Sequence, residues 1–170
     1  VQETEENIFS NDDYIQSIYL NDKINTIEEN VFFGNKEMKT LYLPETIKTI
    51  DEYSFAFNEM LETVIISSNE ITIKDHAFYG CNKLTNVFIL STTKIEITTN
   101  SFEECSNLNQ IIVPSTIQDT LLNKLKESIK IDITKTELGK CGSECIYTFN
   151  STNNYLTIYA INKGVGGDDS

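Results

Sequence analysis

Few side chains in this chain have the type and spacing that chemistry requires. The chain holds one histidine, His76, and four cysteines, at positions 81, 105, 141 and 145. A structural zinc site takes four such ligands, and a Ser–His or Cys–His pair needs a histidine beside the nucleophile. The glycine-rich stretch at residues 164–167 lacks the lysine and the strand–helix setting of a phosphate loop. We therefore predict a chain without enzymatic activity, metal ion or cofactor.

The cysteines at 141 and 145 form a separate candidate site. They lie four residues apart in "CGSEC", and this spacing fits a local disulfide if the protein is extracellular. Free thiols remain the alternative, whereas a zinc site would need two further ligands. Asn150 opens the sequon "NST", a candidate N-glycosylation site if the protein is secreted.

The other two cysteines and His76 belong to a repeat marked by five phenylalanines. These are Phe9, Phe32, Phe55, Phe78 and Phe102, separated by 23, 23, 23 and 24 residues. A fixed period of this length indicates a solenoid. Cys81 and Cys105 share one position of the unit, where Asn stands twice, so we interpret them as small, half-buried residues that bond to the backbone of the next turn. His76 shares its position with Asn7, Asn30, Tyr53 and Asn100, which indicates a surface position.

Each unit also contains a predicted strand. Apolar residues follow each Phe at +6, +9 and +11, and the alternation of the last two is typical of a strand with one buried face. The +9 residues are Ile18, Leu41, Val64, Val87 and Ile111, and the +11 residues are Leu20, Leu43, Ile66, Ile89 and Val113. A second apolar pair precedes each Phe from the second unit on. These side chains predict a continuous core along the solenoid.

The unit resembles the BspA-like, or Treponema-type, leucine-rich repeat family. The best-matching segment is "HAFYGCNKLTNVFIL", from His76 to Leu90, and the resemblance covers about residues 1–114. It implies an α/β repeat solenoid of about 23 residues per unit with a parallel β-sheet face. It also implies a role in binding host or matrix proteins at the cell surface, because some members are implicated in adhesion.

The repeat pattern divides the chain into three predicted parts. "TEENIF" at 4–9 matches "IEENVF" at 27–32, so we expect residues 1–114 to begin in the middle of a repeat. Residues 115–133 are predicted to cap the last repeat, with a helix that opens on a Ser115–Gln118 capping box and a strand from Ile129 to Ile133. Residues 134–170 are predicted to form a β-hairpin from Cys145 to Tyr159 and a tail, and by the resemblance this segment could start a next module.

The charge of the chain excludes several kinds of partner. The net charge is −13, and all thirteen basic residues are lysines. Nucleic acid and anionic membranes are therefore poor partners, because both need basic clusters. Acidic residues recur ahead of each Phe, at Glu5, Glu6, Glu28, Glu29, Asp51, Glu52 and Asp75. We interpret them as a solvated edge, with a calcium-binding ridge as the alternative.

One further column of residues is the candidate binding site. Tyr19, Tyr42, Ile65, Phe88 and Ile112 lie between the two buried residues of each strand. Period two places them on the opposite face, so we predict an exposed ladder on the sheet. Exposed apolar surface often marks a partner site, although cross-strand ladders also stabilise sheets without any ligand. We predict a non-enzymatic protein-recognition module, with an intracellular scaffold as the alternative. A third hypothesis places an enzyme elsewhere in a longer parent chain.

Overall fold

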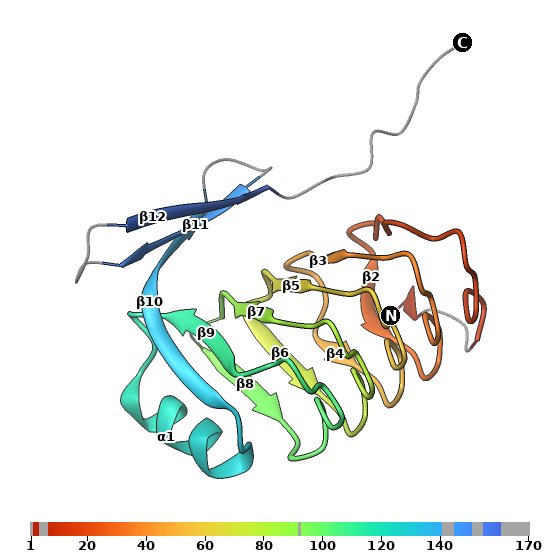
Figure 1. The fold of residues 1–170 in the computed structure, drawn as a ribbon. Coiled ribbons are helices and arrows are strands. Elements are labelled where there is room, and N and C mark those ends of the chain that lie inside the picture. Colours follow the sequence, from red (N-terminus) through yellow and green to blue (C-terminus); the bar gives the residue numbers. More distant parts are fainter. Residues whose placement is uncertain (1, 4–6, 92, 141–144, 151–154, 161–170) are drawn as a thin grey trace.

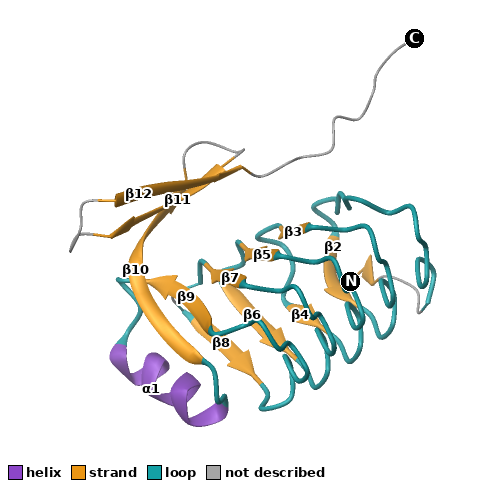
Figure 2. Cartoon of the chain, in the orientation of Figure 1, coloured by secondary structure: helices purple, strands orange, loops and turns teal. Residues whose placement is uncertain are grey.

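The chain winds into a solenoid of about five coils, as predicted. The computed structural model describes residues 2–3, 7–91, 93–140, 145–150 and 155–160. The coils stack side by side, and after the first coil each one contributes a short strand to each of two sheets (Figure 1). Strands of successive coils pair in parallel. A helix and a long strand follow the last coil (Figure 2).

Both sheets run along the solenoid in the order of the coils. The described residues give one sheet in the order β1-β2-β4-β6-β8 and another in the order β12-β11-β10-β9-β7-β5-β3. The strands of the first sheet are β1 (Gln2–Glu3), β2 (Ile24–Ile27), β4 (Thr49–Ile50), β6 (Glu70–Ile73) and β8 (Lys94–Ile97). Those of the second are β3 (Thr40–Leu43), β5 (Thr63–Ile66), β7 (Asn86–Ile89), β9 (Gln110–Pro114), β10 (Asp132–Lys140), β11 (Cys145–Asn150) and β12 (Tyr155–Ala160). Equivalent positions of successive units pair directly, for example Leu41 with Val64 and Val64 with Val87.

The phenylalanines form a continuous stack inside the solenoid. Successive rings have centroids 5.2–5.5 Å apart and planes within 7–9° of parallel. Phe55 and Phe78 are fully buried, whereas Phe9, at the end of the stack, is 46% exposed. At nearly parallel planes these centroid distances are those of offset aromatic stacking.

A polar ladder runs beside the phenylalanine stack. The Asn35 and Asn58 side-chain amides donate to the carbonyl oxygens of Phe9 and Phe32 at 2.9 and 2.8 Å. The thiols of Cys81 and Cys105 donate in the same way to the carbonyls of Phe55 and Phe78, at 3.2 and 3.0 Å. The interpretation of this position as a backbone-bonding residue is therefore confirmed. Two details differ from the prediction: the bond runs to the preceding coil instead of the next one, and the residue is buried instead of half-buried.

The repeat position that holds His76 has a left-handed backbone in most coils. Four of its five members have a left-handed backbone: Asn7, Asn30, Tyr53 and His76, with φ between 54° and 60°. A second left-handed position follows each Phe by two residues and holds Asn11, Gly34, Phe57, Gly80 and Glu104. Asn and Gly adopt this conformation at least cost, which explains their frequency here.

The last coil is covered by a helix, as predicted, but the details differ. Helix α1 (Asp119–Ser128) buries Leu122 and Leu125 against the core. The capping box is wrong: the helix begins after Gln118 without a side-chain cap, and Ser115 donates to Glu137 instead, at 2.9 Å. The strand begins at Asp132 and pairs in parallel with β9, so the predicted boundary at 133/134 lies inside β10. The β11–β12 hairpin forms where it was predicted.

Truncation of a central ring tests the stack. Phe55→Ala removes a fully buried side chain that contacts two other rings, so we expect a loss of about 3–5 kcal/mol in the free energy of unfolding. Urea denaturation measures it. The matched control is Tyr14→Ala at a 90% exposed ring, which should change stability by less than about 0.5 kcal/mol. Equal denaturation midpoints for the two variants would refute the stack.

The left-handed position can be tested at Asn30, whose side chain bonds only to its exposed neighbour Glu29 in the described structure. Asn30→Val places a β-branched residue at a φ of 58° and should cost about 1–2 kcal/mol. Asn30→Gly should be tolerated, because glycine adopts this conformation freely. Thermal melting of the pair measures the difference, and equal melting temperatures would contradict a left-handed backbone there.

Candidate functional site

The predicted ladder is exposed only at its beginning. Tyr19 is 72% exposed and Tyr42 is half-buried, but Ile65 and Phe88 are fully buried and Ile112 is 7% exposed. The expectation of five exposed residues on one face is therefore wrong for Ile65, Phe88 and Ile112. A binding role for the column remains a proposal, and it now concerns the two tyrosines.

The buried part of the ladder forms a second apolar cluster outside the solenoid core. Ile65, Phe88 and Ile112 pack together, with Tyr42 and Leu90 against them. β10 pairs with β9 as far as Thr136 and then continues to pair with β11. In Figure 1 this path carries the β11–β12 hairpin over the outer side of the sheet. An apolar sheet face is buried when a second layer packs on it, and the hairpin lies on this side of the sheet in Figure 1.

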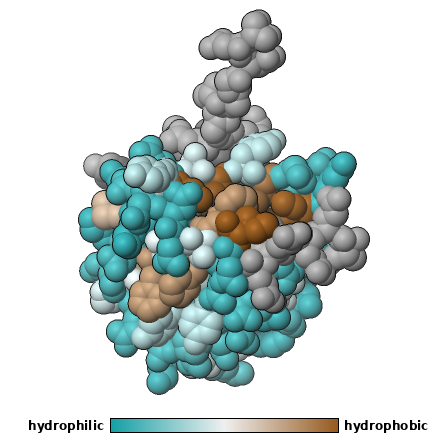
Figure 3. Space-filling model, turned by 90° about the vertical axis from the view of Figure 1, so that its right-hand side faces the viewer, coloured by the Kyte–Doolittle hydropathy of each residue, from teal (hydrophilic) through white to brown (hydrophobic). Residues whose placement is uncertain are grey.

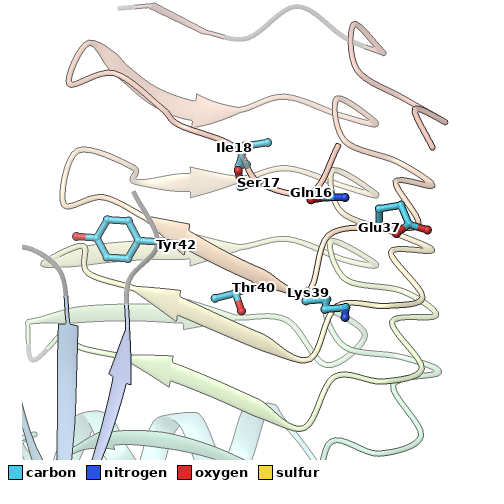
Figure 4. Close-up of a pocket in the computed structure, with 7 residues that line it drawn as sticks. All are labelled: Gln16, Ser17, Ile18, Glu37, Lys39, Thr40 and Tyr42. Atoms are coloured by element: carbon cyan, nitrogen blue, oxygen red, sulfur yellow. The ribbon is translucent and has the colours of Figure 1, made fainter. Parts of the chain in front are cut away.

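The uncovered part of the face lies between the first two coils. A hollow of about 360 Å³ opens there, lined by Gln16, Ser17, Ile18, Glu37, Lys39, Thr40 and Tyr42 (Figure 4). The lining combines polar groups with nearly as much apolar surface, including one aromatic ring. Within the described residues, Glu37 and Lys39 take part in no ion pair. Both charges are therefore available to a ligand at this hollow.

The first coil does not form the strand predicted at Ile18–Leu20. Its side chains follow the pattern, because Ile18 and Leu20 pack against the core while Tyr19 points out. Its backbone, however, does not pair as a strand, so β3 is the end strand of the second sheet within the described residues. Figure 3 views this end of the solenoid and shows apolar surface in the middle of a mostly hydrophilic face. Ile8 of the first coil is 52% exposed.

A group of aromatic side chains on the turns was not foreseen. The Tyr53 and His76 rings stack at 4.9 Å, and Tyr79 lies edge-on to His76 at 5.5 Å. Phe57 continues the contact to Tyr79 and to Phe33, each at 5.2 Å. The sequence signal was the presence of ring-bearing residues two before the core Phe (Tyr53, His76) and one or two after it (Phe33, Tyr79, Phe57). Contacts of this kind stabilise neighbouring turns without any ligand.

The remaining candidate residues have structural surroundings. The His76 imidazole lies 2.8 Å from the Glu103 carboxylate. Burial raises the pKa of the Cys81 thiol well above its usual value, and the neighbouring Cys105 thiol adds to the shift. Both are free cysteines, and the uncharged thiol is a poor nucleophile.

The acidic edge is partly neutralised within the protein. The Lys74 ammonium lies 2.7 Å from the Asp51 carboxylate. The hydrogen bond to Asp51 is the largest cause that raises the pKa of Lys74. No group of three or more His, Cys, Asp or Glu side chains converges within the part of the chain that the structure describes. In the same part, no helix has the length and apolarity to cross a bilayer.

The predicted modification sites cannot be placed. Cys141 lies outside the described residues. Cys145 begins β11 and Asn150 ends it, but the description does not extend to their side chains. The disulfide and the glycosylation site remain predictions.

The divided ladder predicts opposite outcomes for two aromatic residues of one column. Phe88→Ser removes a fully buried ring and should lower the free energy of unfolding by about 3–5 kcal/mol, in the range of other buried aromatic truncations. Tyr19→Ser changes a mostly exposed ring and should stay within about 0.5 kcal/mol of the parent. Chemical denaturation of both variants measures this. Similar small effects would mean that the whole ladder is exposed after all.

Comparison with known proteins gives one clear relationship. The model of the BspA-type leucine-rich repeat region matches six copies, over residues 2–132 and 71–163. No curated protein and no solved structure gives a significant match. Leucine-rich repeats are typically non-enzymatic scaffolds for protein–protein interaction, and this family is commonly associated with surface proteins. Because the match spans nearly all of the sequence, and the structure shows the repeating coils, the chain belongs to the BspA-type leucine-rich repeat family.

Proposed function

We propose that this chain is the protein-recognition module of a cell-surface protein that adheres to host or matrix proteins. Its contact surface is the uncovered beginning of the second sheet, with Tyr19 and Tyr42 beside the hollow between the first two coils. Tyr19 carries the proposal: it is a large ring, 72% exposed, at a repeat position that the later coils bury. A ring left exposed at such a position is available to a partner.

The chemistry of this surface suits a protein partner. Tyrosine is enriched at protein interfaces because it adds a large apolar area and a hydroxyl at low conformational cost. The open hollow beside it has polar groups in its lining, with Glu37 and Lys39 at its border. Such groups confer specificity through hydrogen bonds and ion pairs.

The cell-surface location is supported by the family association, and two predicted features of the C-terminal segment are compatible with it. A disulfide between Cys141 and Cys145 and a glycan on Asn150 would both fit an extracellular protein. The alternative is an intracellular scaffold of the same architecture. Surface labelling of intact cells and the redox state of the two cysteines separate these cases.

Binding of purified matrix proteins tests the contact surface. The chain is immobilised, and binding of a panel of purified extracellular-matrix proteins is measured by interferometry. A Tyr19→Ser/Tyr42→Ser variant should lose about tenfold or more in affinity, as expected for the loss of aromatic anchors worth about 1–2 kcal/mol. The control is Tyr14→Ser, a 90% exposed tyrosine outside the sheet face, which should bind like the parent.

Unchanged affinity of the double variant, with an unchanged melting temperature, would exclude the two tyrosines as the contact. A double variant with Tyr42→Ser and Phe88→Ser, two aromatic residues of the same column, would test the contact surface less well. Phe88 is fully buried, so its loss would lower binding by damaging the fold.

A further inference from the structure

β3, the strand at the N-terminal end of the second sheet, has an unpaired edge within the described part of the chain. There it pairs with β5 on one side, and no described strand pairs with its other side. The carbonyls of Lys39 and Leu43 accept from Thr63 and Ser67 of the β5 side, at 3.2 and 2.9 Å. Because alternate residues of a parallel strand bond to opposite neighbours, the backbone groups of Thr40 and Tyr42 point away from β5. Two N–H and two C=O groups therefore face the first coil.

The first coil does not satisfy these groups. It stacks on the second coil at the phenylalanine side, where the Phe9 and Asn11 amides donate to Val31 and Phe33 at 3.0 and 2.6 Å. At the sheet, however, no backbone hydrogen bond joins described residues 16–20 to β3. The hollow occupies this position, and Figure 4 shows Ser17 and Ile18 on one side of it and Thr40 and Tyr42 on the other. The first two coils are thus bonded at the phenylalanine side and separated at the sheet, where a pair of strands would otherwise form.

We propose that the open edge of β3 binds an extended, basic segment of a partner protein by strand addition. The segment bonds to the backbone of Thr40 and Tyr42 and places its side chains against Tyr19, Tyr42 and the hollow. Main-chain bonds provide affinity in this mode, and alternate side chains provide specificity. The mode rests on the proposed function, because it specifies how the same surface would recognise its partner.

Charge favours a basic segment over a second copy of the chain. Between residues 7 and 46 there are seven carboxylates and three lysines. Each copy carries a net charge of −13, so pairing two copies edge to edge would bring like charges together, which is unfavourable. A lysine- or arginine-rich strand would meet the net negative charge of these coils. At the hollow its direct partner would be Glu37, and a basic side chain would avoid the like-charged Lys39.

The strand also carries features that limit unspecific pairing. β3 is four residues long, with Lys39 before it and Pro44 after it. Short strands, lysine and proline are the usual protections of exposed edges. They shorten the available ladder to Thr40 and Tyr42, so a partner needs side-chain contacts in addition to the backbone bonds.

Amide hydrogen exchange of the whole chain, followed by NMR, tests the edge. In the free protein we expect fast exchange at Thr40 and Tyr42 and slow exchange at Leu41 and Leu43, whose amides bond to β5. The probe is a short peptide of alternating Thr and Val flanked by Lys. Its addition should slow exchange at Thr40 and Tyr42 by about tenfold or more when the site is nearly saturated.

Two controls isolate the backbone contribution. A fully N-methylated copy of the peptide keeps its side chains and charge but has no amide donors, so it should bind at least about tenfold more weakly. Thr40→Pro removes one edge N–H that β5 does not use, so it should weaken peptide binding while the chain melts normally.

The outcomes distinguish the mode from the function. Equal binding of the N-methylated peptide, no saturable binding at millimolar peptide, slow exchange of Thr40 and Tyr42 in the free protein, or a dimer in sedimentation would each overturn strand addition. The matrix-protein assay with the Tyr19→Ser/Tyr42→Ser variant is independent of these results. If the double variant loses binding to matrix proteins while the N-methylated peptide binds as tightly as the parent peptide, the proposed function stands and strand addition fails. Recognition would then occur through side chains alone.

Discussion

The structure depends on the stacking of identical positions in successive coils. The phenylalanine rings meet at 5.2–5.5 Å, close to the spacing of hydrogen-bonded strands. Ring stacking and backbone pairing therefore reinforce the same distance between coils. Each Phe amide from Phe9 to Phe78 also donates to the residue just before the next Phe, for example Phe55 to Ala77 at 2.8 Å. A coil that lost this register would lose apolar and polar contacts together.

Burial of the turns is possible because backbone carbonyl groups beside the Phe column are satisfied between coils. The Asn and Cys side chains beside the Phe column each bond a carbonyl of the preceding coil. The same turns contain two left-handed residues, which direct these side chains inward and return the chain to the sheet. An unpaired carbonyl buried there would be destabilising. The need to bond this carbonyl explains why a small hydrogen-bond donor recurs beside the Phe column. The left-handed backbone explains why Asn or Gly recurs at the two left-handed positions.

The two ends of the solenoid differ in a way that bears on function. α1 and β10 cover the last coil, and β10 leads into the hairpin over the outer side of the sheet. The first coil keeps Phe9 and Tyr19 exposed and separates from β3 at the sheet. Exposed rings, backbone groups that have no partner among the described residues, and a hollow with charged side chains thus occur together at one end. That coincidence directs both proposals to the first two coils.

Much of the fold followed from the order of residues. The 23-residue period and the buried Phe and strand positions come from local patterns that repeat along the chain. The capping helix and the hairpin come from the apolar spacing and turn residues within their own segments. The period also placed Tyr19, Tyr42, Ile65, Phe88 and Ile112 on one face, because side chains alternate along a strand. These features depend on neighbours at fixed separations, which periodicity detects.

Tertiary structure alone decided which part of that face is accessible. Ile65, Phe88 and Ile112 are buried in a cluster on the side that β10 and the hairpin approach, and no spacing in the sequence records that approach. The gap beside β3 is likewise a matter of packing, since Ile18 and Leu20 keep the strand pattern while their backbone stays unpaired. The sequence by itself determined the repeating unit, its buried positions and the residues that share a face. The contacts between distant segments, which carry no period, decided where the repeat is left open.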